Sequence, residues 1–195
     1  MKRLTALLIA LIFTAIPALA TASTWVIDPD HSHIGFKIRH MMVSNVRGGF
    51  GTFSGNVEFD EKNITRSTTK VTIETASIDT GVEKRDAHLR SADFFDVATY
   101  PTMTFTSKKV AKASGGIKVT GDLTLHGVTR EVVLNVEGPT GEFKDPWGNT
   151  RRGATATTTI NRKDFGLNWN AMIESGGILV GEEVTIILEV ELIKK

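Results

Sequence analysis

The chain has 195 residues and a formal net charge of +1, and 41% of its residues are hydrophobic. This composition is typical of one packed globular domain, and the balance of 23 basic and 22 acidic residues argues against a nucleic-acid-binding surface. The absence of cysteine from the sequence excludes disulfide bonds, iron–sulfur clusters, thiolate zinc sites and a cysteine nucleophile.

The first residues have the pattern of an export signal. Two basic residues follow Met1, an uncharged apolar stretch extends from Leu4 to Leu19, and small residues at A-x-A spacing come next. The stretch is short for a bilayer span and contains a proline, which favours a cleaved signal over a retained anchor helix. We expect a signal peptide over residues 1–22, cleaved after Ala22, and one exported domain over 23–195 without stable membrane insertion.

From the start of this domain, apolar and polar residues alternate with a period of two. Successive side chains of a strand point to opposite faces, so each alternating run predicts a strand with one apolar face. The runs include Ile34–Ile38, Val57–Phe59, Val71–Ile73, Met103–Phe105, Ile117–Leu125, Val132–Val136 and Val184–Leu192. Because helical segments between these runs are almost entirely missing, about eight consecutive strands predict an antiparallel meander.

A sheet whose strands each have one apolar face must close into a barrel or fold into a sandwich. Turn-forming glycines such as Gly115, Gly127 and Gly176 separate the predicted strands. Four glycines between Gly48 and Gly55 lie in what we expect to be one long strand. Glycines inside a strand indicate bulges or sharp coiling, which the closure of a barrel requires.

One segment departs from the alternation. Thr80 and Glu83 have the spacing of a capping box, in which the two side chains satisfy the first backbone donors of a helix. We expect a short helix from there to about Arg90, with Val82 and Leu89 on one face. A helical insert of this kind can cover one mouth of a barrel.

His31 and His33 are the most direct candidates for metal ligands. Residues i and i+2 of one strand share a face, so the two imidazoles would point the same way. A third ligand would have to come from Asp28, His40, His88 or His126. No spacing selects among these, so a metal-dependent enzyme using His31 and His33 stays an alternative, and hydrogen bonding with Asp28 at the strand start is the plainer interpretation.

Other catalytic and nucleotide-binding signatures are missing from the sequence, including the G-x-S-x-G elbow and glycine-rich phosphate loops. We therefore expect no enzymatic activity, no resident metal and no cofactor. Arg85 and His88 on the predicted helix are candidates for holding an anionic head group, and a solvated helical face is the alternative.

The interior of the expected barrel is itself a candidate binding site. Closed barrels of about eight strands are either filled by side chains or hold one ligand. Burying a hydrocarbon contributes about 0.8 kcal/mol per methylene, so an apolar tunnel can hold a long chain with few polar contacts. Alternation does not distinguish an open lumen from a filled one, so a structural barrel with a filled lumen stays an alternative.

Short motifs follow one another along the chain in a fixed order and spacing. They are Trp25–Asp28, His31–Phe36, Val46–Phe50, Gly55–Asp60, Ser77–Thr80, Arg85–Ser91, Asp93–Asp96, Gly121–Thr129 and Arg162–Leu167. Together they resemble the YceI-like family of periplasmic polyisoprenoid-binding proteins. The resemblance implies an all-β fold, a lipocalin-like extended eight-stranded antiparallel β-barrel with a short helix near one end.

The resemblance also implies that an elongated pocket binds a long amphipathic lipid, such as a polyisoprenoid, an isoprenoid quinone or a fatty-acid derivative, for transport, storage or sequestration in the periplasm. Some members of the family form dimers, which leaves a homodimer open. Strand parity places a set of apolar residues on the lumen side of the expected barrel: Ile34, Phe36, Ile38, Met103, Phe105, Leu123 and Leu125. We also place Phe165 and Trp169 at or near the lumen, with Arg85 and His88 as head-group contacts.

Overall fold

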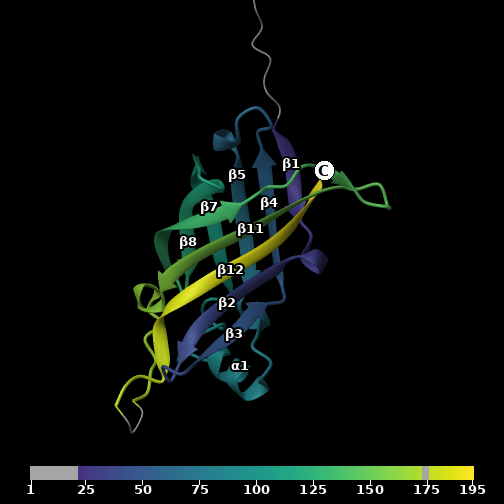
Figure 1. Cartoon of the computed structure of the whole chain (residues 1–195). Coiled ribbons are helices and arrows are strands. Elements are labelled where there is room, and N and C mark those ends of the chain that lie inside the picture. The colour runs from purple at the N-terminus through teal and green to yellow at the C-terminus, as the bar shows by residue number, and fades with distance from the viewer. Residues whose placement is uncertain (1–21, 173–175) are drawn as a thin grey trace, which may run out of the picture.

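The computed structural model describes residues 22–172 and 176–195, and this part of the chain is mostly β-structure (Figure 1). The strands are β1 (Ser23–Ile27), β2 (His33–His40), β3 (Ser44–Phe50), β4 (Phe53–Phe59), β5 (Thr68–Glu74), β6 (Ile78–Asp79), β7 (Thr102–Ala113), β8 (Gly116–Leu125), β9 (Val128–Glu137), β10 (Phe143–Lys144), β11 (Thr150–Asn161) and β12 (Val180–Lys194). The helices are α1 (Glu83–Arg90) and the 3₁₀ turns η1 (Pro29–His31), η2 (Ile64–Arg66), η3 (Thr75–Ser77) and η4 (Arg162–Phe165). Apart from Ala22, the expected signal peptide lies outside the described residues.

Within residues 22–172 and 176–195, eight strands close into an antiparallel barrel. Their order around the barrel is β1, β4, β5, β7, β8, β9, β11 and β12, and β12 pairs again with β1. The longest seam joins β11 to β12, from Arg151 opposite Ile193 to Asn161 opposite Glu183. The predicted all-β, lipocalin-like barrel is therefore confirmed.

The strands β1 and β2 follow the same edge of β12, and η1 interrupts them. Ile27 lies opposite Leu192, and His33 lies opposite Glu189. The turn forms because Pro29 cannot continue the ladder as a donor and because the Asp28 carboxylate accepts a hydrogen bond from the Asp30 amide at 3.1 Å. One interrupted strand thus lengthens this side of the barrel beyond β1.

The strands β3 and β4 form a second interrupted strand, so the expectation of one continuous strand through Gly48 and Gly55 is wrong. The break is at Gly51, whose amide donates to the Ser77 carbonyl at 3.1 Å instead of to the neighbouring strand. The next residue, Thr52, accepts from the Glu74 amide at 2.9 Å. The hairpin of β2 and β3 therefore extends from the barrel toward α1 (Figure 1).

Helix α1 lies at this extended end, opposite the end that carries the C-terminus (Figure 1). The helix is confirmed, but the predicted capping box is wrong. Because the helix begins at Glu83, this residue is the first helical residue rather than the third, and its carboxylate contacts Arg90 at 3.5 Å. The buried Asp86 instead accepts hydrogen bonds from the Thr80 amide at 3.0 Å and the Thr80 hydroxyl at 2.5 Å.

The end of the barrel opposite α1 is packed around Trp25, which is fully buried. The guanidinium of Arg152 lies 5.0 Å from the Trp25 ring centre and 4.5 Å from that of Phe59. Such cation–π contacts stabilise a cation beside aromatic faces. In the part of the chain that the structure describes, no helix has the length and apolar character needed to cross a membrane.

Candidate functional site

The barrel encloses a cavity of about 710 Å³. All eight barrel strands contribute apolar side chains to its wall. One from each strand is Ile27, Val57, Val71, Phe105, Leu123, Leu134, Ala156 and Leu188. Ligand pockets in proteins usually measure about 300–1,000 Å³, so the cavity has the size of a binding site. The lumen is therefore open, and the alternative of a filled lumen does not describe this barrel.

All seven residues that strand parity assigned to the lumen lie in the cavity wall: Ile34, Phe36, Ile38, Met103, Phe105, Leu123 and Leu125. Trp169, which was placed at or near the lumen on other grounds, lies there too. Arg85 and His88 line the cavity as well. The alternation of β2, β7 and β8 accounts for this result, because residues of one parity share the inner face. Ligand binding by these residues stays a prediction.

Phe165 lies elsewhere. It is 1% exposed, but it is not among the residues that line the cavity. The turn η4 ends at Gly166, which has a φ of 80° and reverses the chain direction. This reversal carries Leu167 and Trp169 to the cavity wall and leaves Phe165 in the packed core beside His126, whose Nδ1 lies 3.3 Å from the Phe165 carbonyl oxygen.

Three rings pack together at the α1 end of the cavity. The ring centre of His88 lies 4.8 Å from Trp169 and 5.0 Å from Phe94, and both contacts are edge-to-face. Phe94 and Trp169 are 5.1 Å apart. The His88 Nε2 atom also lies 2.9 Å from an Asp93 carboxylate oxygen. These contacts join α1 and the segment after η4 into one rim of the cavity.

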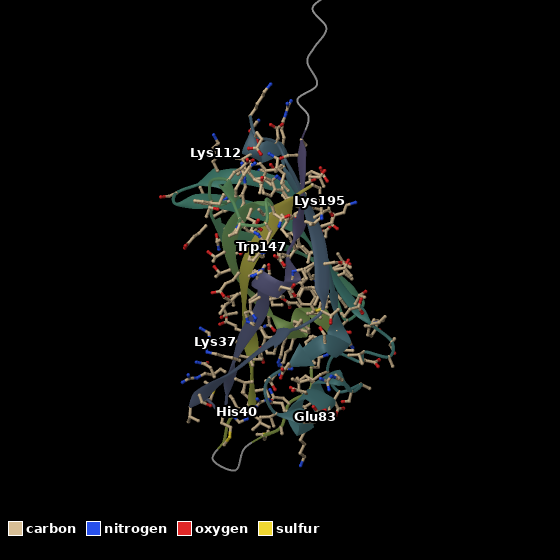
Figure 2. The ribbon with its side chains drawn as sticks, turned by 90° about the vertical axis from the view of Figure 1, so that its right-hand side faces the viewer. Lys37, His40, Glu83, Lys112, Trp147 and Lys195 are labelled. Atoms are coloured by element: carbon tan, nitrogen blue, oxygen red, sulfur yellow. The ribbon has the colours of Figure 1, made fainter. Side chains whose placement is uncertain are left out.

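The ionisable residues in the cavity wall are all basic. They are Arg39, His40, Lys84, Arg85, His88 and Arg162. None of the acidic residues in the described ranges lines the cavity. Figure 2 shows that His40 and Glu83, which mark β2 and the start of α1, lie at the end opposite Lys112 and Lys195. The cavity is apolar along its length and positively charged near α1.

Arg85 is held in place by the loop before the helix. Its Nε donates to the Thr80 hydroxyl oxygen at 2.7 Å, and its Nη2 donates to the Thr80 carbonyl oxygen at 2.8 Å. The same hydroxyl donates to Asp86. Burial by itself would raise the pKa of Asp86, but the hydrogen bonds from Thr80 outweigh it and lower the pKa. The wall near α1 therefore contains the fixed cation of Arg85, and the ionised Asp86 carboxylate that helps to hold Thr80 is not among the lining residues.

Arg162 is a cavity residue that the sequence did not reveal as a site residue. Its side chain is 3% exposed, and burial lowers the pKa of its guanidinium. Nε donates to the Gly181 carbonyl oxygen at 2.8 Å, and Nη1 donates to the Leu167 carbonyl oxygen. An arginine directly after a strand normally indicates solvent, and only its place before the apolar Phe165 and Leu167 hinted at burial.

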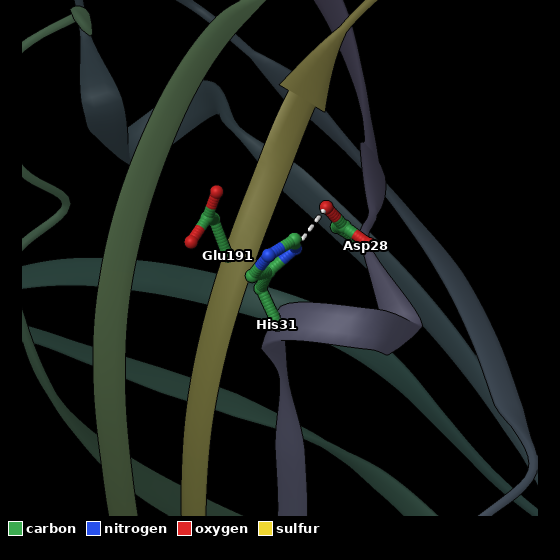
Figure 3. Close-up of side chains that lie close together, drawn as sticks. All are labelled: Asp28, His31 and Glu191. Carbon is green, nitrogen blue, oxygen red and sulfur yellow. Dashed lines mark hydrogen bonds and ion pairs between the residues drawn. The ribbon is translucent and has the colours of Figure 1, made fainter. Parts of the chain in front are cut away.

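His31 and His33 do not form a metal site. His31 belongs to the turn η1 rather than to a strand, and His33 begins β2, so the shared face that the metal hypothesis required does not exist. The residues that do meet are Asp28, His31 and Glu191, whose potential ligand atoms lie within 4.8 Å of one another (Figure 3). His31 Nδ1 lies 2.9 Å from Asp28 Oδ2, as the plainer hydrogen-bonding interpretation expects.

The guanidinium of Arg151 links the carboxylates of this cluster. Its Nη1 lies 2.5 Å from Asp28 Oδ2 and 2.6 Å from Glu191 Oε1, and its Nε lies 2.6 Å from Asp145 Oδ2. Burial would raise the pKa of Asp28, but hydrogen bonds from Arg151 and His31 outweigh it and lower the pKa. The guanidinium of Arg151 pairs with the Asp28 and Glu191 carboxylates that a metal ion would need, and its charge would repel that ion, so this cluster is an ion-pair network.

Comparison with known proteins agrees with the fold of the barrel. A UPF0312 protein of Vibrio parahaemolyticus is 45% identical over 154 residues, which cover 77% of this chain and 81% of the relative. The solved structure of Burkholderia cenocepacia BcnA has 26% identity and a TM-score of 0.72 over 85% of this chain and 98% of its own. A Saccharophagus degradans domain described as polyisoprenoid binding and implicated in plant cell wall breakdown has 19% identity and a TM-score of 0.64, covering 88% of this chain and 98% of its own. The model of the YceI-like domain matches residues 25–192, and the chain therefore belongs to the YceI-like family.

Proposed function

We propose that this protein binds one long amphipathic lipid inside its barrel, with the hydrocarbon chain along the lumen and the head group at the α1 end. The observation that carries the proposal is the open cavity of about 710 Å³, whose wall is apolar on all eight strands. Each buried methylene contributes about 0.8 kcal/mol, so a polyisoprenoid, an isoprenoid quinone or a fatty-acid-like chain gains affinity mainly from its length.

The comparisons support this proposal at the level of fold and family. The S. degradans barrel is described as polyisoprenoid binding, and at 19% identity it supports the barrel rather than a particular ligand. The apolar stretch near the N-terminus favours export to the periplasm, where the protein would transport, store or sequester its lipid. An apolar cavity of about 710 Å³ supports this role, because it has room for a hydrocarbon chain.

A binding role suits the cavity better than an enzymatic one. Its wall is largely apolar, and the sequence contains no G-x-S-x-G nucleophile elbow. In residues 22–172 and 176–195, the one cluster with metal-ligand residue types has the guanidinium of Arg151 between its carboxylates. The relatives reported above carry no enzyme name.

Native mass spectrometry of the mature protein, purified from its exporting host without detergent, tests the proposal. We expect a mass shift that corresponds to one lipid, and binding of one fluorescent prenyl or acyl probe after the lipid has been extracted. Protein that carries no lipid and binds neither probe would contradict the proposed function.

A further inference from the structure

Arg162 places a positive charge in the wall of a largely apolar cavity. Two of its guanidinium nitrogens donate to the backbone carbonyls of Gly181 and Leu167, which fixes the orientation of the group. Within the described residues, its third nitrogen, Nη2, is buried and has no hydrogen-bond partner. A buried donor without an acceptor is destabilising, so this nitrogen is a place where a ligand oxygen would be favoured.

The charge of Arg162 also lacks a paired carboxylate in the part of the chain that the structure describes. The nearby Glu182 interacts with Arg162 only at longer range, because its carboxylate contacts Lys163 Nζ at 2.5 Å. Arginine does not lose its proton in proteins, and a buried charge without a counter-ion is strongly destabilising. The ligand-free barrel therefore keeps an uncompensated cation at its cavity wall.

Arg152 shows how the same barrel treats a buried arginine with a structural role. Its side chain is 11% exposed, and it pairs with Glu61 at 2.9 Å and with Glu142 at 3.3 Å. It also lies over the rings of Trp25 and Phe59, and it is not among the cavity-lining residues. Within the described residues, Arg152 Nε also lacks a hydrogen-bond partner, so an unpaired donor alone does not mark a ligand contact. The two arginines differ in charge pairing, because Arg152 contacts two carboxylates and Arg162 contacts none in the described ranges.

We propose that Arg162 binds the head group of the lipid and that this head group is an anion, either a carboxylate or a phosphate. This inference rests on the proposed function and specifies its ligand class. A neutral carbonyl or hydroxyl oxygen would satisfy Nη2 as an acceptor but would leave the charge uncompensated. An anionic oxygen accepts a hydrogen bond from Nη2 and also compensates the charge of the guanidinium. Such a charge-assisted hydrogen bond is about twice as strong as a neutral one.

The surroundings of Arg162 favour the same ligand class. The other ionisable residues of the wall are Arg39, His40, Lys84, Arg85 and His88, and none of these is acidic. The positive charges of Arg39, Lys84 and Arg85 attract an anion to the α1 end of the cavity. Because Nη2 is buried in the cavity wall, the head-group oxygen can contact it only after neighbouring side chains shift. The hydrocarbon chain then extends along the apolar lumen toward Phe105.

A set of ligands with one chain and different head groups tests this inference. Hexadecyl phosphate, hexadecanoate and hexadecanol each displace a fluorescent acyl probe from the delipidated mature protein, below their aggregation concentrations. We expect both anions to bind about tenfold or more tightly than the alcohol, because hydrogen bonds to charged groups are among the strongest. Tighter binding of the phosphate identifies a lipid phosphate as the ligand class, and tighter binding of the carboxylate identifies a fatty acid.

Variants of the two buried arginines separate the head-group contact from a structural effect. Arg162→Met should reduce the anion preference to about twofold or less, because the ionic contact with the head group is lost. The variant also loses the hydrogen bonds to the Gly181 and Leu167 carbonyl oxygens, so its stability is measured beside its affinities. Arg162→Lys retains the charge without the planar fork and should keep part of the preference. The matched control, Arg152→Met, should keep all of it. Circular dichroism verifies that each variant is folded.

The outcomes distinguish this inference from the proposed function. Equal binding of the three ligands to the natural protein, or an unchanged anion preference in Arg162→Met, overturns the role of Arg162 while lipid binding stands. If Arg162→Met does not fold, an unchanged preference in Arg162→Lys overturns it instead. If neither the probe nor any of the three ligands binds, the proposed function itself fails.

Discussion

The ring of Phe105 lies against Gly121 of the neighbouring strand: a Cβ atom added to Gly121 would be 2.5 Å from Cζ of Phe105. Phe36 and Gly48 have the same relationship on the other side of the barrel, where the corresponding distance is 2.7 Å. Each ring occupies the space that a side chain on the adjacent strand would fill. Glycines of β3 and β8 thus accommodate two rings of the lumen wall.

This packing predicts that Gly121→Ala destabilises the barrel. The new methyl group would also lie 2.5 Å from the Thr106 carbonyl oxygen, so both the ring and the strand must shift. We expect a loss of about 1–3 kcal/mol in the free energy of unfolding, measured by urea denaturation. Gly141→Ala is the control, because no atom lies within 4 Å of its added Cβ. Equal stability of the two variants would contradict the packing described.

A charge at Phe105 should weaken lipid binding. Phe105 is 7% exposed in the lumen wall, and Phe105→Glu would place a carboxylate where the hydrocarbon chain lies. Desolvating that charge should weaken binding of an acyl probe at least about tenfold. Phe143→Glu makes the same change at a residue that is 67% exposed, and it should bind the probe normally. Because Phe105→Glu also loses stability, circular dichroism must accompany the titration, and full affinity in a folded Phe105→Glu protein would exclude the lumen as the site.

The ion-pair network around Arg151 should make the protein sensitive to acid. Burial opposes ionisation of Asp145, but hydrogen bonds from Arg151 and Asn149 outweigh it and lower its pKa from 3.8 to about 2. A lowered pKa stabilises the folded state above the unfolded value, and this stabilisation is lost as the pH falls from about 4 toward 2. The pKa of Asp28 is also lowered, so it acts in the same direction.

Unfolding curves recorded between pH 2 and pH 9 measure this effect. Arg151→Met should reduce the loss of stability below pH 4, because the hydrogen bonds that lower both pKa values are removed. The effect of His31 on stability has the opposite pH dependence, because the hydrogen bond to Asp28 raises the pKa of His31. Its contribution to the free energy of unfolding is present below about pH 6.5 and is lost as the pH rises through the raised pKa. A natural protein and an Arg151→Met variant with the same acid dependence would show that the network does not stabilise the fold.

The loop before α1 gives a test of the observed cap. Asp86→Asn removes the charge that accepts two hydrogen bonds from Thr80, and we expect a loss of about 1–3 kcal/mol in the free energy of unfolding. Glu83→Gln is the matched control at the position that the capping-box interpretation favoured, and it should change stability by less than about 0.5 kcal/mol because Glu83 is exposed. The reverse order of the two effects, measured by thermal unfolding, would restore the capping box.

Alternation alone was enough to predict the strands and most of the inner face. Met103 and Phe105 in β7, like Leu123 and Leu125 in β8, have the parity that the structure places in the cavity wall. Parity is a local property of an extended backbone, so it is available from the sequence. Closure followed because one-sided strands have no other way to bury their apolar faces than a barrel or a sandwich.

Features that depend on three-dimensional distances were not predictable in the same way. The turn at Pro29 removed His31 from the strand, and the break at Gly51 required bonds to a segment distant in sequence. Whether the lumen is open depends on the distance across the barrel, which alternation does not contain. Arg162 was missed because a charged residue after a strand indicates solvent, and its burial depends on the backbone of Gly181 and Leu167.

The most direct test of the central claim is to fill the lumen and count bound lipids. Ala156 faces the cavity from β11, between Val136 and Leu188 of the neighbouring strands, and Ala156→Trp places a large ring in the lumen. Thr157→Trp adds the same ring at the next, exposed position of the strand as a control. We predict by native mass spectrometry one lipid on the natural protein and on Thr157→Trp, and none on a folded Ala156→Trp. One lipid retained by Ala156→Trp with undiminished affinity would contradict binding inside the barrel.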